Sequence, residues 1–125
     1  MTDNVKRIIE ILELEPLPIE GGFFKETYRS EEIIPNKCLP NRYKSSRIFS
    51  TAIYYLLTPD TFSALHMLPS DEIFHFYAGD PVEMLQLFED GTGKVIKMGN
   101  EIEKGYFPQI VVPKNTWQGT RLISG

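Results

Sequence analysis

Cysteine is nearly absent, because Cys38 is the only one among 125 residues. One thiol cannot close an intramolecular disulfide, which excludes the cross-linked class of small secreted proteins and makes a cytoplasmic location the expectation. No window approaches the roughly 20 apolar residues that a membrane helix needs. The N-terminus also lacks the basic and apolar regions of a secretory signal. We therefore expect no membrane partner.

Positive charge is also scarce, with 13 lysines and arginines against 17 acidic residues and a net charge of −4. Proteins that bind the phosphate backbone rely on clustered basic residues, so nucleic acid is not an expected partner. Arg42, Lys44 and Arg47 do gather in a proline-flanked loop. Three charges in a solvated loop are more often a surface than a binding patch, and we favour that interpretation.

Histidine is confined to one stretch of the chain. His66 and His75 are the only two, and they flank the acidic pair Asp71 and Glu72. Apolar and polar residues alternate on both sides of this pair, which predicts two short strands joined by a turn. The stretch is therefore a candidate site held on strands.

The length is suited to one domain, residues 1–125, because domains commonly run to about 100 to 150 residues. We predict an N-terminal helix within residues 1–15, because apolar residues over 4–13 have nearly helical spacing and Thr2 or Asp3 is available as a cap. Pro16 and Pro18 should end this helix. Residues 30–46 are polar and rich in proline and asparagine, which predicts a long loop or arm.

The rest of the chain has the pattern of an all-β protein. We predict a strand buried on both faces over residues 48–57, since this stretch is the most apolar. Further strands are expected over 23–29, 62–68, 72–77, 82–88, 94–98, 109–112 and 116–123. Short strands at even spacing, separated by turn signals, are typical of a β-sandwich or barrel.

The two-residue period of a strand decides which site residues can converge. Glu72, Phe74 and Phe76 share one face of their strand, whereas His75 lies on the other. His66 with Glu72 is therefore the favoured catalytic pair. The alternative is that His66 is a hydrogen-bonded interior histidine and Glu72 a solvated turn residue.

Several ordered motifs resemble those of the cupin superfamily. His66-Met-Leu68, Glu72 and Gly79 resemble the first cupin motif, and the run from Gly105 through Pro113 to Gln118 resembles the second. The fuller match is to a small uncharacterised cupin family, through Glu20-Gly-Gly-Phe-Phe-Lys-Glu-Thr-Tyr-Arg-Ser30, Ser70-Asp-Glu-Ile-Phe-His-Phe-Tyr-Ala-Gly-Asp-Pro81 and Pro108-Gln-Ile-Val-Val-Pro113. The resemblance implies a jelly-roll barrel related in fold to sugar epimerases.

The same resemblance implies a metal site, but two of its positions are changed. Leu68 stands where cupins usually carry their second histidine, and Gln118 stands where the last one would be. The remaining set is His66, Glu72 and Gln118, and an amide is a weak ligand for zinc or iron. No cofactor is firmly implied, and a weakly bound divalent metal is the most that this set predicts.

The remaining residues suit proton transfer or binding of a small molecule. A partly buried His66 held by Glu72 could act as a base, with Tyr55, Tyr28 or Tyr77 as its acid partner. Gln118, Phe74, Phe76 and Trp117 are candidate pocket residues, and Arg29 would suit an anionic ligand. The leading hypothesis is an epimerase-like or isomerase-like enzyme for a sugar-related or polar metabolite. The alternatives are a non-catalytic ligand-binding protein and a metal-dependent enzyme.

A homodimer is expected, built on the strand over 23–29 and the arm that follows it. A structureless polar segment as long as 30–46 would gain order against a partner. Related cupins also commonly pair through N-terminal strands. The resembling family continues through further barrel strands, so residues 1–125 are expected to lack the last strands. A turn is expected over the last two residues, after the strand that contains Arg121 and Leu122.

Overall fold

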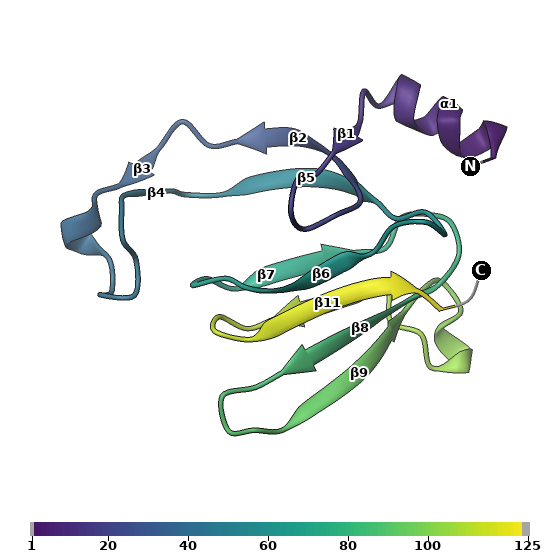
Figure 1. Cartoon of the computed structure of the whole chain (residues 1–125). Helices are drawn as coiled ribbons and strands as arrows, with labels where there is room; N and C mark the ends of the chain where they lie inside the picture. The colour runs from purple at the N-terminus through teal and green to yellow at the C-terminus, as the bar shows by residue number, and fades with distance from the viewer. Residues whose placement is uncertain (1, 124–125) are drawn as a thin grey trace.

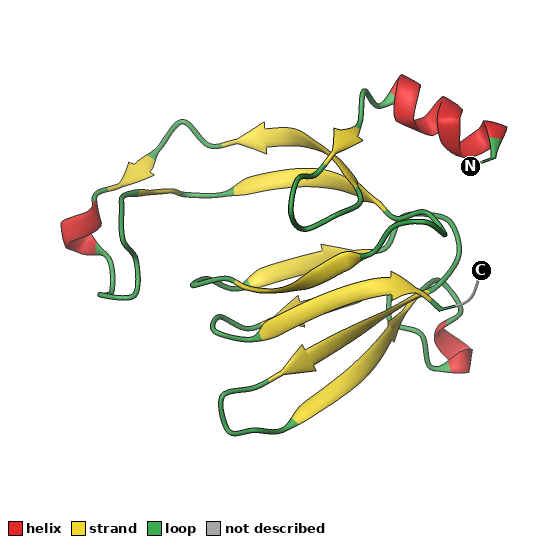
Figure 2. Cartoon of the chain, in the orientation of Figure 1, coloured by secondary structure: helices red, strands yellow, loops and turns green. Residues whose placement is uncertain are grey.

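The computed structural model describes residues 2–123 and consists mostly of strands (Figure 1; Figure 2). Its helical elements are α1 (Asp3–Ile11) and two short 3-10 turns, η1 (Asn36–Cys38) and η2 (Ile102–Lys104). The strands are β1 (Glu15–Pro16), β2 (Phe23–Arg29), β3 (Ile33–Ile34), β4 (Arg47–Ile48), β5 (Thr51–Leu56), β6 (Ser63–Met67), β7 (Glu72–His75), β8 (Val82–Leu87), β9 (Gly93–Met98), β10 (Gln109–Val112) and β11 (Trp117–Leu122). The predicted all-β class with one N-terminal α-helix is confirmed. The turn expected over the last two residues lies outside the described residues.

Helix α1 begins where the sequence places a cap. The Thr2 side chain accepts a hydrogen bond from the Val5 backbone N–H at 3.2 Å, which satisfies one of the free donors of the first turn. The helix ends at Ile11, before the prolines, because Glu13 adopts a left-handed conformation with φ of 55°. It contributes no fully buried residue.

Two sheets form the body of the barrel. The larger has the order β6-β11-β8-β9, and β10 pairs with β7 in the other, with every pairing antiparallel. A third sheet, β1-β2-β5, lies beside them in the upper part of Figure 1. From β5 to β8, and again from β9 to β11, each strand lies in a different sheet from the strand before it, an alternation typical of a jelly roll.

The ribbon formed by β2 and β5 continues away from the barrel as an arm, in which β3 pairs with β4 (Figure 1). This arrangement contradicts the prediction that the strand over residues 48–57 is buried on both faces. The first four residues of β5, from Thr51 to Tyr54, are exposed. Apolar composition marks this stretch as a strand, but its first residues lie in the ribbon that runs beyond the barrel, and only Tyr55 and Leu56 at its end are partly buried.

The apolar core lies at one part of the barrel interior. It consists of Met84, Met98, Ile110 and Val112, which are at most 4% exposed. Partly buried side chains of Phe74, Phe76, Val82 and Ile96 pack around it. The core therefore joins the larger sheet to the β7–β10 pair.

Candidate functional site

A row of polar residues crosses the larger sheet beside the apolar core. The register pairs Gln118 of β11 with His66 of β6 on one side and with Gln86 of β8 on the other. Directly paired residues point to the same face of a sheet. Gln118 and Gln86 are 1% and 0% exposed, so this row faces the barrel interior.

Glu72 reaches the row from the opposite sheet. Its Oε1 accepts a hydrogen bond from Gln118 Nε2 at 2.9 Å. The register between β7 and β10 runs without a bulge from Glu72 to His75, so Glu72 points inward and His75 lies exposed on the outer face. The predicted separation of Glu72 and His75 by strand period is confirmed.

His66 is oriented by two neighbours, and neither is Glu72. Its Nδ1 lies 2.8 Å from the Ala64 carbonyl oxygen, which only accepts, so Nδ1 carries the proton. Its Nε2 lies 3.8 Å from Oε2 of Glu20. The imidazole is 18% exposed and the Glu20 side chain 39% exposed. Glu20 is absent from the residues that strand periodicity predicts for the site, although it begins the Glu20-Gly-Gly motif.

The turn that carries Glu20 is held closely against β5 and β6. The Glu20 carbonyl accepts a hydrogen bond from Ala64 N–H at 2.7 Å, and the Gly21 carbonyl accepts one from the Tyr55 hydroxyl at 2.5 Å. Gly22 has φ of +78°, and a Cβ added there would lie 2.7 Å from the Tyr55 hydroxyl oxygen. The paired glycines therefore allow the turn to approach Tyr55 and so fix Glu20 beside His66.

Of the three candidate tyrosines, only Tyr55 lies near the carboxylates. Burial raises the pKa of its hydroxyl, the charges of Glu20 and Glu72 act in the same direction, and Ser63 opposes them. Tyr55 therefore stays protonated at neutral pH, with its proton donated to the Gly21 carbonyl. Tyr28 and Tyr77 are 55% and 74% exposed, so the structure brings neither into the site.

Four predicted pocket residues lie elsewhere. Trp117 precedes Gln118 on β11, so it points to the outer face, where it is 45% exposed. Arg29 is exposed on the arm and forms an ion pair with Glu26 at 2.7 Å. Phe74 and Phe76 point inward but pack against the apolar core. The aromatic wall and the cationic pocket residue predicted from the sequence are therefore not formed.

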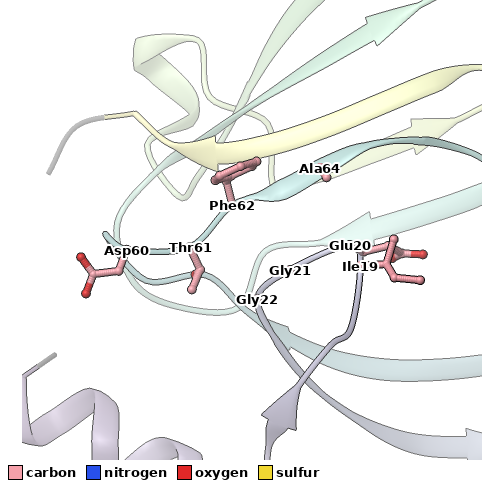
Figure 3. A pocket seen from close by; sticks show the side chains of 8 residues that line it. All are labelled: Ile19, Glu20, Gly21, Gly22, Asp60, Thr61, Phe62 and Ala64. Carbon is pink, nitrogen blue, oxygen red and sulfur yellow. The ribbon is translucent and has the colours of Figure 1, made fainter.

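A shallow hollow of about 230 Å³ adjoins the site (Figure 3). The turn over residues 19–22 and the segment over 60–64 surround it, and its lining includes Glu20, Asp60 and Phe62. His66, Glu72 and Gln118 are not among its lining residues. Glu20 thus belongs to both features, and the hollow lies beside the polar row rather than over it.

The side chains around His66 do not fit a tightly held metal ion. Within residues 2–123, no group of three or more histidine, cysteine or acidic residues is placed to share one. Gln118 directs its amide N–H group at Glu72, which leaves only its amide oxygen, a weak ligand for zinc or iron. Leu68 contributes no ligand. Of the predicted set, only His66 and Glu72 remain firm ligands, fewer than the three protein ligands usual at a catalytic zinc.

The charge around the row is negative. No lysine or arginine of residues 2–123 forms an ion pair with Glu20 or Glu72. The two carboxylates can therefore accept hydrogen bonds from a ligand. The described chain also contains no helix long and apolar enough to span a membrane.

Comparison with known proteins places this geometry in a family. Residues 6–125 match the model described as Cupin_5, cupin superfamily (DUF985). An uncharacterized protein of Saccharomyces cerevisiae is 32% identical over 109 residues, which cover 83% of this chain and 54% of that protein. The chain thus spans about half the length of this curated relative.

Two solved structures have the same fold. A hypothetical protein from Leishmania major matches with a TM-score of 0.82 and 30% identity over 93% of this chain and 68% of its own. A protein from Shewanella oneidensis matches with a TM-score of 0.84 and 29% identity over 98% of this chain and 72% of its own. The chain therefore belongs to the Cupin_5 family (DUF985) of the cupin superfamily.

Proposed function

We propose that this protein binds a small polar metabolite in the barrel interior and that His66 transfers a proton on it, as an epimerase or isomerase does. The observation that carries this proposal is the orientation of His66. Its Nδ1 proton is donated to the Ala64 carbonyl, so the lone pair of the neutral imidazole lies on Nε2, which faces Glu20. An imidazole held in this tautomer can accept a proton at Nε2, and the adjacent carboxylate stabilises the imidazolium that forms.

A non-catalytic binding protein is the second candidate, and the state of Tyr55 favours it. Proton transfer on both faces of a substrate carbon needs an acid as well as a base. The Tyr55 hydroxyl is engaged with the Gly21 carbonyl, and Tyr28 and Tyr77 are exposed elsewhere. The site therefore has one well-oriented proton acceptor, which would serve ligand recognition as well as catalysis.

Substitution of His66 separates these two functions. Ligands are first found by screening polar metabolites for an increase in melting temperature, because binding to the folded state stabilises it by mass action. Under the enzyme hypothesis, His66→Gln should keep ligand binding but lose at least a hundredfold in turnover or solvent-hydrogen exchange, the usual contribution of a general base being about 10² or more.

The matched control is His75→Gln, because His75 is exposed on the outer face of the same stretch. It should leave binding and turnover unchanged. Loss of function in the His75 variant alone would contradict the assignment of His66. Binding without any turnover or hydrogen exchange in the wild-type protein would favour the binding protein.

We further propose a cytoplasmic homodimer that pairs through β2 and the arm. Large apolar side chains are exposed along this ribbon, namely Tyr28, Ile33, Phe49, Ile53 and Tyr54. Burying them against a second copy would gain hydrophobic free energy and would order the arm. Light scattering should give the mass of a dimer at micromolar concentration, and a strictly monomeric mass would contradict the proposal.

A further inference from the structure

The polar row contains more hydrogen-bond acceptors than donors. A carboxylate offers about four acceptor positions. Glu72 accepts one side-chain hydrogen bond, from Gln118, and the Glu20 carboxylate lies 3.8 Å from His66 Nε2, beyond hydrogen-bond distance. Acceptor positions on both carboxylates therefore remain available to a bound molecule.

Gln86 supplies an independent acceptor in the same row. Its Nε2 donates to the Val111 carbonyl at 3.2 Å and to the Met84 sulfur at 3.3 Å, which fixes the orientation of the amide. Its Oε1 is buried and has no hydrogen-bond partner within residues 2–123. A buried polar atom without a hydrogen-bond partner destabilises the fold, so this oxygen can be satisfied by a donor from outside the described chain.

Thr120 adds a second unpartnered atom on the same inner face. It lies two residues from Gln118 on β11 and is 6% exposed, and its hydroxyl oxygen has no partner in the described chain. Gln118 separates His66 from Gln86 in the strand order. By register, Thr120 lies between Ser63 of β6 and Met84 of β8, whereas Gln86 lies across Gln118 from His66. A ligand hydroxyl, or a water ordered by the ligand, would pair these two inner atoms.

The hollow beside Glu20 also presents hydrogen-bond acceptors to a ligand. Asp60 and Glu20 lie at opposite ends of it in Figure 3, and the ring of Phe62 is 61% exposed. Carboxylates suit ligands that donate hydrogen bonds, and an exposed ring offers an apolar face for the C–H side of a sugar. A phosphate or carboxylate group would instead be repelled at short range by two or more negative charges.

We infer that the site selects an uncharged, hydroxyl-rich ring molecule, a free sugar or cyclic polyol, and excludes its phosphorylated form. This inference rests on the proposed function, since it names the ligand class of that same site. It also replaces the anionic ligand that Arg29 would have suited. The hydroxyl groups would donate to Glu20, Glu72 and the Gln86 row, and His66 would act on the carbon that they position.

The test compares free sugars with their phosphates. A panel of pentoses, hexoses and inositols, each as the neutral compound and as its monophosphate, is measured by thermal shift and then by calorimetry. At least one neutral member should bind, and its monophosphate should bind at least tenfold more weakly at low salt. Tighter binding of the phosphate, or binding by no neutral member, would overturn the inference.

Two variants then test which residues cause the preference for the neutral sugar over its phosphate. Gln86→Leu should weaken binding of the neutral ligand at least fivefold, because it removes the unpartnered acceptor. Glu20→Gln should narrow the difference between sugar and phosphate, whereas the control Glu101→Gln removes one surface charge and should leave it unchanged. An equal effect of Glu20→Gln and Glu101→Gln would show that the discrimination depends only on net charge and would overturn the assignment.

The two proposals fail in different ways. If neutral sugars bind but neither turnover nor hydrogen exchange depends on His66, the ligand class stands and the catalytic function is wrong. If His66-dependent turnover is found only with phosphorylated substrates, the catalytic function stands and the ligand class is wrong.

Discussion

Met84 and Gln86 lie two residues apart on β8, point to the same side of the sheet and have no exposed surface. Met84 packs in the apolar core with Met98, Ile110 and Val112. Gln86 instead keeps an oxygen without a partner in the described chain. One half of the interior is thus filled by apolar packing, while the other holds polar side chains, of which the Gln86 oxygen lowers stability until it is paired.

Stability should separate these two halves most clearly. Met84→Ala removes a fully buried side chain and leaves a cavity, so we expect it to lower the free energy of unfolding by about 2 to 5 kcal/mol. Gln86→Leu also removes the bond to Val111, but it removes the unpaired oxygen too, and the net change should stay within about 1 kcal/mol. Urea denaturation of both variants measures the contrast. Equal destabilisation would show that Gln86 is a packing residue like Met84.

The turn that carries Glu20 should be the next most sensitive element. Gly22→Ala places a side chain at a left-handed φ and against the Tyr55 hydroxyl. We expect it to lower the free energy of unfolding by about 2 to 3 kcal/mol. Gly105→Ala is the matched control, because Gly105 has a similar φ of +88° and no atom within 4 Å of the added Cβ. Gly105→Ala should lower the free energy of unfolding by about 1 kcal/mol. If the two variants lose the same stability, the contact between the turn and Tyr55 does not constrain Glu20.

The smallest expected effect on stability comes from deprotonation of Tyr55 at alkaline pH. The pKa of Tyr55 is raised in the folded state, so the protonated hydroxyl stabilises the fold fully below about pH 10, the ordinary tyrosine value. This contribution is lost as pH rises through the higher folded-state pKa. Tyr55→Phe should therefore show a shallower loss of melting temperature above pH 10 than the wild-type protein.

Tyr28→Phe is the control for this measurement, since Tyr28 is exposed on the arm. Its alkaline profile should match that of the wild-type protein. An unchanged profile in the Tyr55 variant would mean that this hydroxyl is hydrated in the folded protein.

Local sequence patterns predict the strands well. The predicted range 109–112 coincides with β10, and 23–29 coincides with β2. The inward position of Glu72 and the outward position of His75 follow from strand period alone. The same period separates Trp117 from Gln118, so one of these two adjacent residues had to lie outside the pocket.

Local sequence patterns do not predict the contacts that turns make. Glu20 lies in a turn with no regular period, and it is 46 residues before His66 in the chain. Its place depends on the Gly21 and Gly22 conformations and on the hydrogen bond from Tyr55, all of which are tertiary. The prediction that β5 is buried on both faces is wrong for a related reason. The apolar pattern does not show whether another element covers the strand.

The side-chain amides of the three glutamines test the division of the interior most directly. Gln86 and Gln118 belong to the polar row, whereas Gln109 is exposed beside His75 on the outer face. Nuclear magnetic resonance follows their amide signals during titration with the neutral sugar that binds best. The signals of Gln86 and Gln118 should shift in proportion to occupancy, and that of Gln109 should not. A shift confined to Gln109, or saturation of binding with Gln86 and Gln118 unmoved, would contradict a ligand site in the polar half of the barrel.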